Sequence, residues 1–199
     1  MGQTVSNVIF DVGNVLIDFC WEKTCEMLHF SRDIIDAFEK NMILTDVWDM
    51  LDEGTISLEH AILRFIEAMP QYEKEVRLFW EHADTFVEEY DYAFELIKEL
   101  KEKGYKVYLL SNYPLDMYKL HWPTFRFFEL VDGYIVSAVE KLRKPDIRIY
   151  KLLCERYGLE PSACVFFDDR QINVDAAIEV GMQGILFESD ETVKQYFDL

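Results

Sequence analysis

Half of the 199 residues are hydrophobic and 15% are aromatic, which is enough for a folded core and excludes a disordered chain. The 38 acidic residues outnumber the 20 basic ones, for a formal net charge of −18. A charge of this sign repels phosphate backbones and anionic bilayers, so we expect neither nucleic acid nor membrane as a partner. We expect a cytoplasmic protein with reduced cysteines. Nothing in the sequence indicates its oligomeric state.

Short apolar runs bounded by turn residues recur along the chain. They predict strands at 8–10, 107–110, 134–136, 165–167 and 184–187. The runs are continuous rather than alternating, which is typical of parallel strands covered on both faces. Helical patterns that end at glycines lie between most of them. This alternation predicts an α/β fold with a Rossmann-like parallel sheet core flanked by helices.

One interval, from about residue 18 to residue 86, interrupts this alternation. It shows amphipathic helical patterns and no predicted strand, and Ser31 and Ser57 stand at two expected helix N-caps. An insert of this length exceeds what a crossover between neighbouring strands needs. We therefore predict a helical cap domain at 18–85, inserted into a core made of 1–17 and 86–199.

Polar side chains follow the predicted strands at their carboxyl ends, where open α/β sheets bind ligands. They are Asp11, Ser111, Asn112, Lys144, Asp168 and Asp169. Carboxylates gathered at one edge repel one another unless a cation lies among them, and oxygen ligands favour Mg²⁺. A lysine beside them can neutralise a nucleophilic aspartate and a bound anion together. The pattern therefore indicates phosphoryl transfer through an aspartyl-phosphate.

Four motifs carry a family resemblance: "VIFDVGNVL", "VYLLSNY", "LRKPDIRIY" and "VFFDDRQINVDAA". In this order, each after a predicted strand, they resemble the haloacid dehalogenase-like (HAD) hydrolase superfamily over nearly the whole chain. The helical insert is similar to the first type of cap in that superfamily. Within it, the motifs are most similar to those of small sugar-phosphate phosphatases such as α-D-glucose-1-phosphate phosphatase.

The resemblance implies roles for the residues at the strand ends. Asp11 matches the nucleophile and a Mg²⁺ ligand, and Lys144 matches the lysine that steadies the nucleophile and the phosphate. Asp169 matches the acidic metal ligand, with Asp168 as a partner that acts directly or through water. The implied cofactor is Mg²⁺, and the implied substrate is a small phosphorylated metabolite.

The phosphate oxygens would be held by Ser111, with the backbone of Asn112 beside it, and by Lys144. Tyr113, Arg143 and Arg170 sit next to the motifs and are further candidates for contact with the phosphate or the sugar. Asn173 is interpreted as support for the loop before its helix. The tyrosines, Trp48 and Met50 of the insert are interpreted mainly as core of the cap.

Position 13 departs from the resemblance. Most phosphatases of the superfamily carry a second aspartate there, which protonates the leaving group and lends its carbonyl oxygen to Mg²⁺. Gly13 keeps the carbonyl and lacks the acid, and general acid catalysis contributes about 10²–10⁴-fold. An anomeric phosphate needs less protonation, because its leaving oxygen belongs to a hemiacetal. A water held by Asn14 or a substrate hydroxyl are other sources of a proton, whereas Asp18 lies too far along the chain.

Three functions compete. The leading hypothesis is a Mg²⁺-dependent phosphatase acting on a sugar phosphate, with the cap closing over the substrate. A metal-free dehalogenase is the second, but that group lacks paired acids like Asp168 and Asp169. The third is a phosphate-binding or regulatory protein of the same superfamily, catalytically weakened by Gly13.

Overall fold

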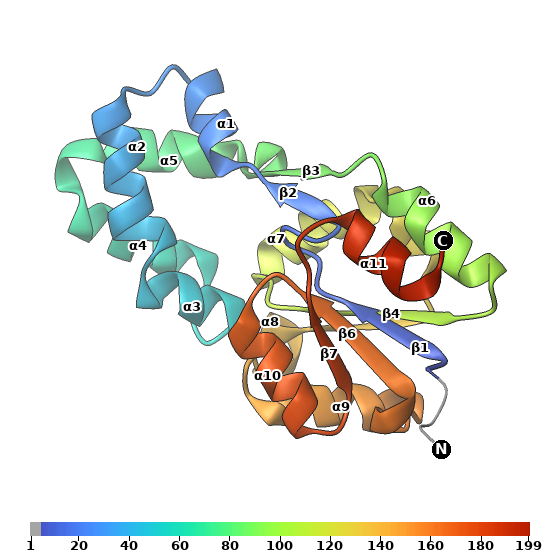
Figure 1. The fold of residues 1–199 in the computed structure, drawn as a ribbon. Helices are drawn as coiled ribbons and strands as arrows, with labels where there is room; N and C mark the ends of the chain where they lie inside the picture. The colour runs from blue at the N-terminus through green and yellow to red at the C-terminus, as the bar shows by residue number, and fades with distance from the viewer. Residues whose placement is uncertain (1–4) are drawn as a thin grey trace.

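The computed structural model describes residues 5–199, in which a helical insert lies to one side of a sheet-based core (Figure 1). The first four residues of the predicted core segment 1–17 lie outside the described residues. The insert leaves the core after the first strand of the sheet and returns before the helix that leads to the second.

The core sheet has five strands. They are β1 (Asn7–Phe10), β4 (Lys106–Ser111), β5 (Gly133–Val136), β6 (Cys164–Asp168) and β7 (Gln183–Leu186). Their order is β5-β4-β1-β6-β7, and every neighbouring pair is parallel. Each predicted run is a strand, so the α/β fold class is confirmed. The chain builds one half of the sheet from β1 outward and then the other half from β6, which places the switch point between β1 and β6.

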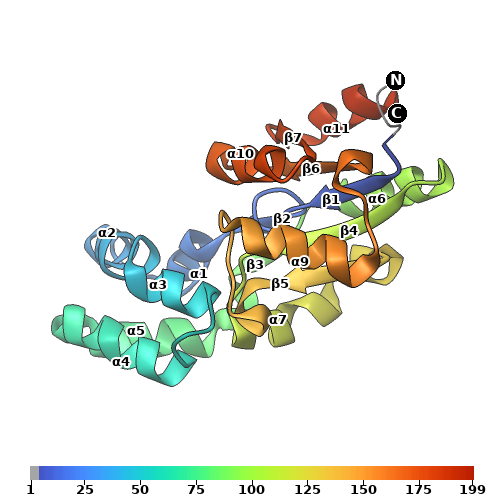
Figure 2. The ribbon, with the colours of Figure 1, turned by 90° about the horizontal axis from the view of Figure 1, so that it is seen from below.

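Helices cover both faces of the sheet (Figures 1 and 2). On one face lie α6 (Ala93–Glu102) and α11 (Asp190–Phe197), and on the other lie α9 (Ile147–Tyr157) and α10 (Gln171–Glu179). Successive strand residues supply the two cores: Val8 and Phe10 pack on the first face and Ile9 on the second. This double coverage explains the continuous apolar runs in the sequence.

Shorter elements border the carboxyl ends of the strands. The helix α7 (Leu115–His121) follows β4, and the single turn α8 (Ser137–Glu140) follows β5. Turns of 3₁₀ helix lie at Pro70–Tyr72, Ala83–Thr85, Trp122–Thr124, Arg126–Leu130 and Pro161–Ala163.

The insert is helical and has a buried centre of its own. Its elements are α1 (Trp21–Met27), α2 (Arg32–Phe38), a π-helical turn (Glu39–Ile43), α3 (Asp46–Asp52), α4 (Leu58–Ala68) and α5 (Glu73–Glu81). Phe38, Phe65 and Phe79 are almost completely buried among these helices. The Ser57 hydroxyl accepts a hydrogen bond from the His60 N–H at the start of α4, as the sequence predicts.

A two-stranded antiparallel ribbon joins the insert to the core. In it β2 (Ile17–Phe19) pairs with β3 (Val87–Glu89). The prediction that no strand occurs in this interval is therefore wrong at Asp18 and Phe19. Each strand has only three residues and neither is fully buried, so no continuous apolar run marks them in the sequence.

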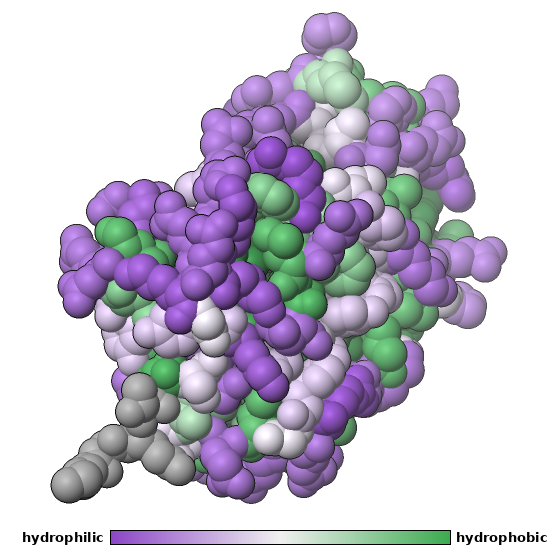
Figure 3. Space-filling model, turned by 90° about the vertical axis from the view of Figure 1, so that its right-hand side faces the viewer, coloured by the Kyte–Doolittle hydropathy of each residue, from purple (hydrophilic) through white to green (hydrophobic). Residues whose placement is uncertain are grey.

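The face on the side of α6 and α11 carries mainly hydrophilic residues, with hydrophobic ones in narrow bands between them (Figure 3). This agrees with the high acidic content of the chain. All four cysteines are buried and free, as expected for reduced structural thiols. Within residues 5–199, no helix has both the length and the apolar character required to cross a bilayer.

Candidate active site

A cavity of about 660 Å³ lies where the carboxyl ends of the central strands face the insert. Five of the predicted site residues are among those that line it: Asp11, Gly13, Asn112, Lys144 and Asp169. The other two, Ser111 and Asp168, are fully buried at the ends of β4 and β6. The structure thus gathers at one place side chains that are up to 158 residues apart in the sequence, from Asp11 to Asp169.

Lys144 lies between two carboxylates at the base of this cavity. Its Nζ is 2.8 Å from Oδ1 of Asp11 and 2.7 Å from Oδ2 of Asp168. The lysine is 1% exposed, and a buried ammonium is tolerated only with such compensation. Asp11 directly follows β1. Its N–H donates a hydrogen bond to the Phe167 carbonyl of β6 at 2.9 Å, which fixes its backbone beside that strand.

The ionisation of this pair follows from burial and mutual attraction. Burial raises the pKa of Asp11 to about 7, and the neighbouring Lys144 acts in the opposite direction. Burial also acts to lower the pKa of Lys144, but Asp11 and Asp168 outweigh it and the pKa stays above its usual range. Lys144 is therefore a permanent cation at neutral pH, beside a carboxylate that burial has made more basic.

Asp168 is fixed by three donors. Its Oδ1 accepts from the Arg170 N–H at 2.8 Å and from Nδ2 of Asn173 at 2.9 Å, while its Oδ2 accepts from Lys144. Asn173, interpreted from the sequence as support for the loop before its helix, lies in the first turn of α10, and its amide contacts both oxygens of Asp168 at the start of that loop. Since both oxygens are engaged, Asp168 in this arrangement positions Lys144.

The loop after β1 also lines the cavity, through Gly13 and Asn14. Asn14 has a left-handed backbone (φ 57°), and its N–H donates to the Ile17 carbonyl at 2.7 Å. Its Nδ2 donates to Oδ2 of Asp169 at 3.3 Å. A Cβ placed on Gly13 would meet no described atom within 4 Å. Packing therefore does not explain the absence of an acid at position 13.

The carboxylates fit a divalent cation. Asp11, Asp168 and Asp169 each offer an oxygen, and these three oxygens lie within 4.8 Å of one another. Burial, and next the charge of Asp168, raise the pKa of Asp169, which a bound cation would reverse. Hard oxygen donors of this kind suit Mg²⁺, and Asp11 and Asp169 are the two that line the cavity.

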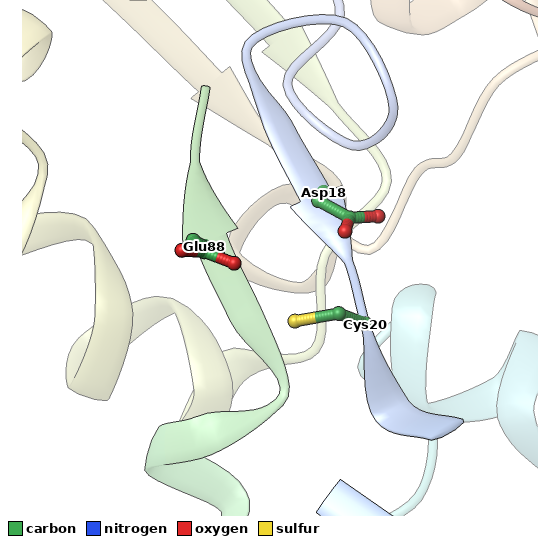
Figure 4. Close-up of side chains that lie close together, drawn as sticks. All are labelled: Asp18, Cys20 and Glu88. Carbon is green, nitrogen blue, oxygen red and sulfur yellow. The ribbon is translucent and has the colours of Figure 1, made fainter. Parts of the chain in front are cut away.

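A second acidic group, on the ribbon, is an internal ion pair. Asp18 and Cys20 lie along the segment that begins with β2, and Glu88 lies on β3 across from them (Figure 4). The Nζ of Lys23 is 2.9 Å from Asp18 and 3.1 Å from Glu88. The ammonium supplies the counter-charge that a metal would supply, so we do not assign a metal to this cluster.

The Asn112 side chain is hydrogen-bonded to the backbone of Lys144. Its Nδ2 donates to the Lys144 carbonyl at 3.0 Å, and its Oδ1 accepts from the Lys144 N–H at 2.8 Å. The side chain thus fixes the backbone of Lys144. The Ser111 hydroxyl makes only a long contact, 3.4 Å, with the Asn112 carbonyl. Because Ser111 is fully buried and does not line the cavity, its contact with a phosphate stays a prediction.

Two residues flanking the motifs are engaged elsewhere in this structure. The Arg143 guanidinium forms two hydrogen bonds, of 3.0 and 2.8 Å, with the Asp49 carboxylate of α3, and so bridges core and insert. The Tyr113 hydroxyl pairs with Nδ1 of His121 at 2.8 Å. Arg170, by contrast, lines the cavity, as does Trp48.

The insert contributes walls that motif reasoning did not find. Apolar lining comes from Phe19, Ile43, Leu44 and Trp48 of the insert, and Ile17, Val87 and Met117 add to it from outside the insert. Acidic lining comes from three residues of α3, which are Asp46, Asp49 and Asp52. Their spacing of three along a helix was the available signal, since it places them on one face.

An open parallel sheet with a lysine-bridged carboxylate cluster at its switch point, beside a helical insert, fits an enzyme of phosphoryl transfer built on an α/β core. The haloacid dehalogenase-like hydrolase family model matches residues 5–181, and the chain belongs to this family. The predicted superfamily is therefore confirmed.

Named relatives agree with this assignment. The sesquiterpene phosphatase astK of Aspergillus oryzae is 26% identical over 186 residues, which cover 93% of this chain and 91% of that protein. Phosphatase MT3486 of Mycobacterium tuberculosis is 25% identical, over 94% of this chain and 88% of that protein. These relatives support the prediction of an enzyme that hydrolyses phosphoric monoesters.

A solved structure extends the likeness to the whole fold. The HAD family enzyme bt-2542 of Bacteroides thetaiotaomicron, in complex with magnesium and inorganic phosphate, superposes with a TM-score of 0.69. It is 25% identical, and the match covers 92% of this chain and 93% of that one.

Proposed function

We propose that this protein is a Mg²⁺-dependent phosphatase that hydrolyses a small phosphorylated metabolite through an aspartyl-phosphate on Asp11. The observation that carries the proposal is the placement of the Lys144 ammonium between Asp11 and Asp168 at the base of the cavity. The family membership, the phosphatase relatives and the magnesium and phosphate complex of the structural relative support it.

The residues of this chain divide the work as follows. An oxygen of Asp11 attacks phosphorus, while Lys144 offsets the charge of the nucleophile and of the transferred group. Ser111 and the backbone of Asn112 hold phosphate oxygens. A Mg²⁺ held by Asp11, Asp169 and the Gly13 carbonyl would supply positive charge that binds and polarises the phosphate. Water then hydrolyses the aspartyl-phosphate and regenerates Asp11.

A sugar phosphate is the first candidate substrate, from the resemblance of the motifs to sugar-phosphate phosphatases. The apolar walls formed by Phe19, Leu44 and Trp48 favour a second candidate, a phosphate ester with a hydrophobic organic part. A sesquiterpene phosphatase among the relatives points the same way. The two classes differ in the surface they bury, because apolar walls stabilise an apolar group and not a ring of hydroxyls.

The test is phosphate release from matched panels of sugar phosphates and prenyl monophosphates, with Mg²⁺ and with chelator. We expect release that requires Mg²⁺ and is lost in Asp11→Asn, and the panel with the higher kcat/KM identifies the substrate class. Asp175→Asn, an exposed substitution on α10, is the control. If no ester is hydrolysed while Mg²⁺ binding is measurable, the protein is instead the weakened phosphate-binding form.

A further inference from the structure

One acid of the insert lines the cavity together with the proposed nucleophile. Asp52 is the last residue of α3 and lines the same cavity as Asp11, Gly13 and Lys144. Motif reasoning did not select it, because it comes from the insert and is 41 residues after Asp11. It reaches the site only through the way the insert folds over the sheet.

The Asp52 carboxyl group is free to act on a ligand. Within residues 5–199 it has no hydrogen-bond or ion-pair partner, whereas Asp49, three residues earlier on α3, is held by Arg143. Burial raises the pKa of Asp52 to about 7. The charged groups that act on it are Asp49 and Asp11, which raise the pKa, and Arg143 and Lys144, which lower it; Tyr113 faces it as well.

Contacts between insert and core hold Asp52 in place without using its side chain. The Ser137 hydroxyl of α8 donates to the Asp52 carbonyl, and the same hydroxyl accepts from the Tyr113 N–H at 2.9 Å. Lys141 donates a hydrogen bond to the carbonyl of Gly54, which is two residues after Asp52. These contacts attach the end of α3 to the loops after β4 and β5, so the carboxyl group is positioned before substrate binds.

We propose that Asp52 is the general acid of this enzyme and performs the proton transfer for which position 13 has no side chain. The inference rests on the proposed phosphatase function. The acid comes from the insert, so that an insert closed over the core is required for the proton transfer as well as for enclosing the substrate. A free carboxyl group aimed into the site and anchored through its backbone carries the assignment.

The transfer is balanced over two steps. In the first, an Asp11 oxygen forms a bond to phosphorus, the bond from phosphorus to the ester oxygen breaks, and that oxygen takes the Asp52 proton and leaves as an alcohol. In the second, water attacks the phosphorus of the aspartyl-phosphate and gives a proton to the Asp52 carboxylate. The bond from phosphorus to Asp11 breaks, and both side chains return to their starting forms.

The decisive experiment compares two leaving groups in Asp52→Asn. An alkyl phosphate needs a proton on its leaving oxygen, whereas the nitrophenolate of p-nitrophenyl phosphate does not. We expect kcat for the alkyl ester to fall by about 10²–10⁴-fold and kcat for the aryl ester to change little. Asp46→Asn removes a charge from the same helix and cavity, and we expect it to change both rates by a common factor.

Other outcomes separate this inference from the proposed function. An equal fall for both esters, or a rise in KM alone, would show that Asp52 only binds substrate and would overturn the inference. No turnover of either ester by the unmodified enzyme would overturn the proposed function itself. Phosphate binding measured by calorimetry should be unchanged in Asp52→Asn, because the contacts of this position use the backbone.

A second variant places an acid at position 13. Gly13 has open space at its Cβ position, so Gly13→Asp can be accommodated. In the Asp52→Asn background we expect this change to restore hydrolysis of the alkyl ester and to leave the aryl ester little changed. Failure of Gly13→Asp to restore a rate that Asp52→Asn has lost would contradict a shared role in proton transfer.

The unmodified enzyme provides a test without substitution. The acid form of Asp52 is required, so the ratio of alkyl to aryl turnover should fall as the pH rises through about 7. A ratio independent of pH would contradict the proposal. Carbon-13 NMR of labelled aspartate in the metal-free protein should show a resonance titrating near this value beside that of Asp11, and only the former should disappear in Asp52→Asn.

Discussion

The two walls of the cavity are built in different ways. On the core side, Asp11, Lys144 and Asp168 are linked by hydrogen bonds of 2.7 and 2.8 Å and are almost fully excluded from water. On the insert side, Asp52 is held through its backbone, and its carboxyl group has no partner among residues 5–199. The comparison teaches that the groups that must stay charged are paired, and the group proposed to exchange a proton is not.

The largest expected effect is on the core side of the cavity, where Lys144 pairs with Asp11 and Asp168. Lys144→Met leaves Asp11 and Asp168 as two neighbouring buried carboxylates without a cation, which costs about 3–5 kcal/mol of unfolding free energy. Phosphatase activity should be lost as well. Urea denaturation followed by circular dichroism measures the first effect, with Lys151→Met on the exposed face of α9 as control. Equal stability of the two variants would show that the ion pairs do not hold this wall together.

A smaller effect tests whether Asp168 positions the lysine. Asn173→Ala removes the amide that contacts both Asp168 oxygens, and we expect a loss of about 1–3 kcal/mol together with a lower kcat. Gln171→Ala, on the same helix and exposed, is the control. A fall in stability with kcat unchanged would restrict Asn173 to a purely structural role.

The ionisation of Asp52, on the insert side, should make the stability of the protein depend on pH. The pKa of Asp52 is raised to about 7 in the folded state, so the folded state binds its proton more tightly than the unfolded state does. The contribution of Asp52 to stability therefore declines as the pH rises from about 4 to about 7. Asp52→Asn should be the more stable protein at pH 8 and should lose this advantage by pH 4. Thermal unfolding across this range checks the sign, and a constant difference would contradict it.

The smallest expected effect concerns the ion pair between Asp49 and Arg143, which joins the insert to the core. Asp49 and Arg143 are partly exposed, so a double-mutant cycle with Asp49→Asn and Arg143→Met should give a coupling of only about 0.2–1 kcal/mol in stability. The same variants should raise KM more than they lower kcat, because the bridge holds the insert over the core. A coupling well above this range would mean that the bridge is desolvated when the insert closes.

The sequence by itself determined the sheet and the core wall of the site. Continuous apolar runs predicted all five strands, since burial on both faces requires them, and the motifs came at or shortly after strands, with α8 between β5 and Lys144. The placement of Asp11 and Lys144 at one edge then followed from parallel pairing. The roles proposed for these residues stay predictions until the variants are measured.

Only the tertiary structure decided the insert side. The ribbon of β2 and β3 is too short to leave a pattern, and the contact of Asn173 with Asp168 depends on how α10 packs against β6. Asp52 meets the cavity because α8 anchors the end of α3, a contact between positions 85 residues apart. A strand repeats every two residues and a helix every 3.6, so both can be recognised locally. The packing of the insert against the core leaves no repeating pattern in the sequence, so only the folded structure shows it.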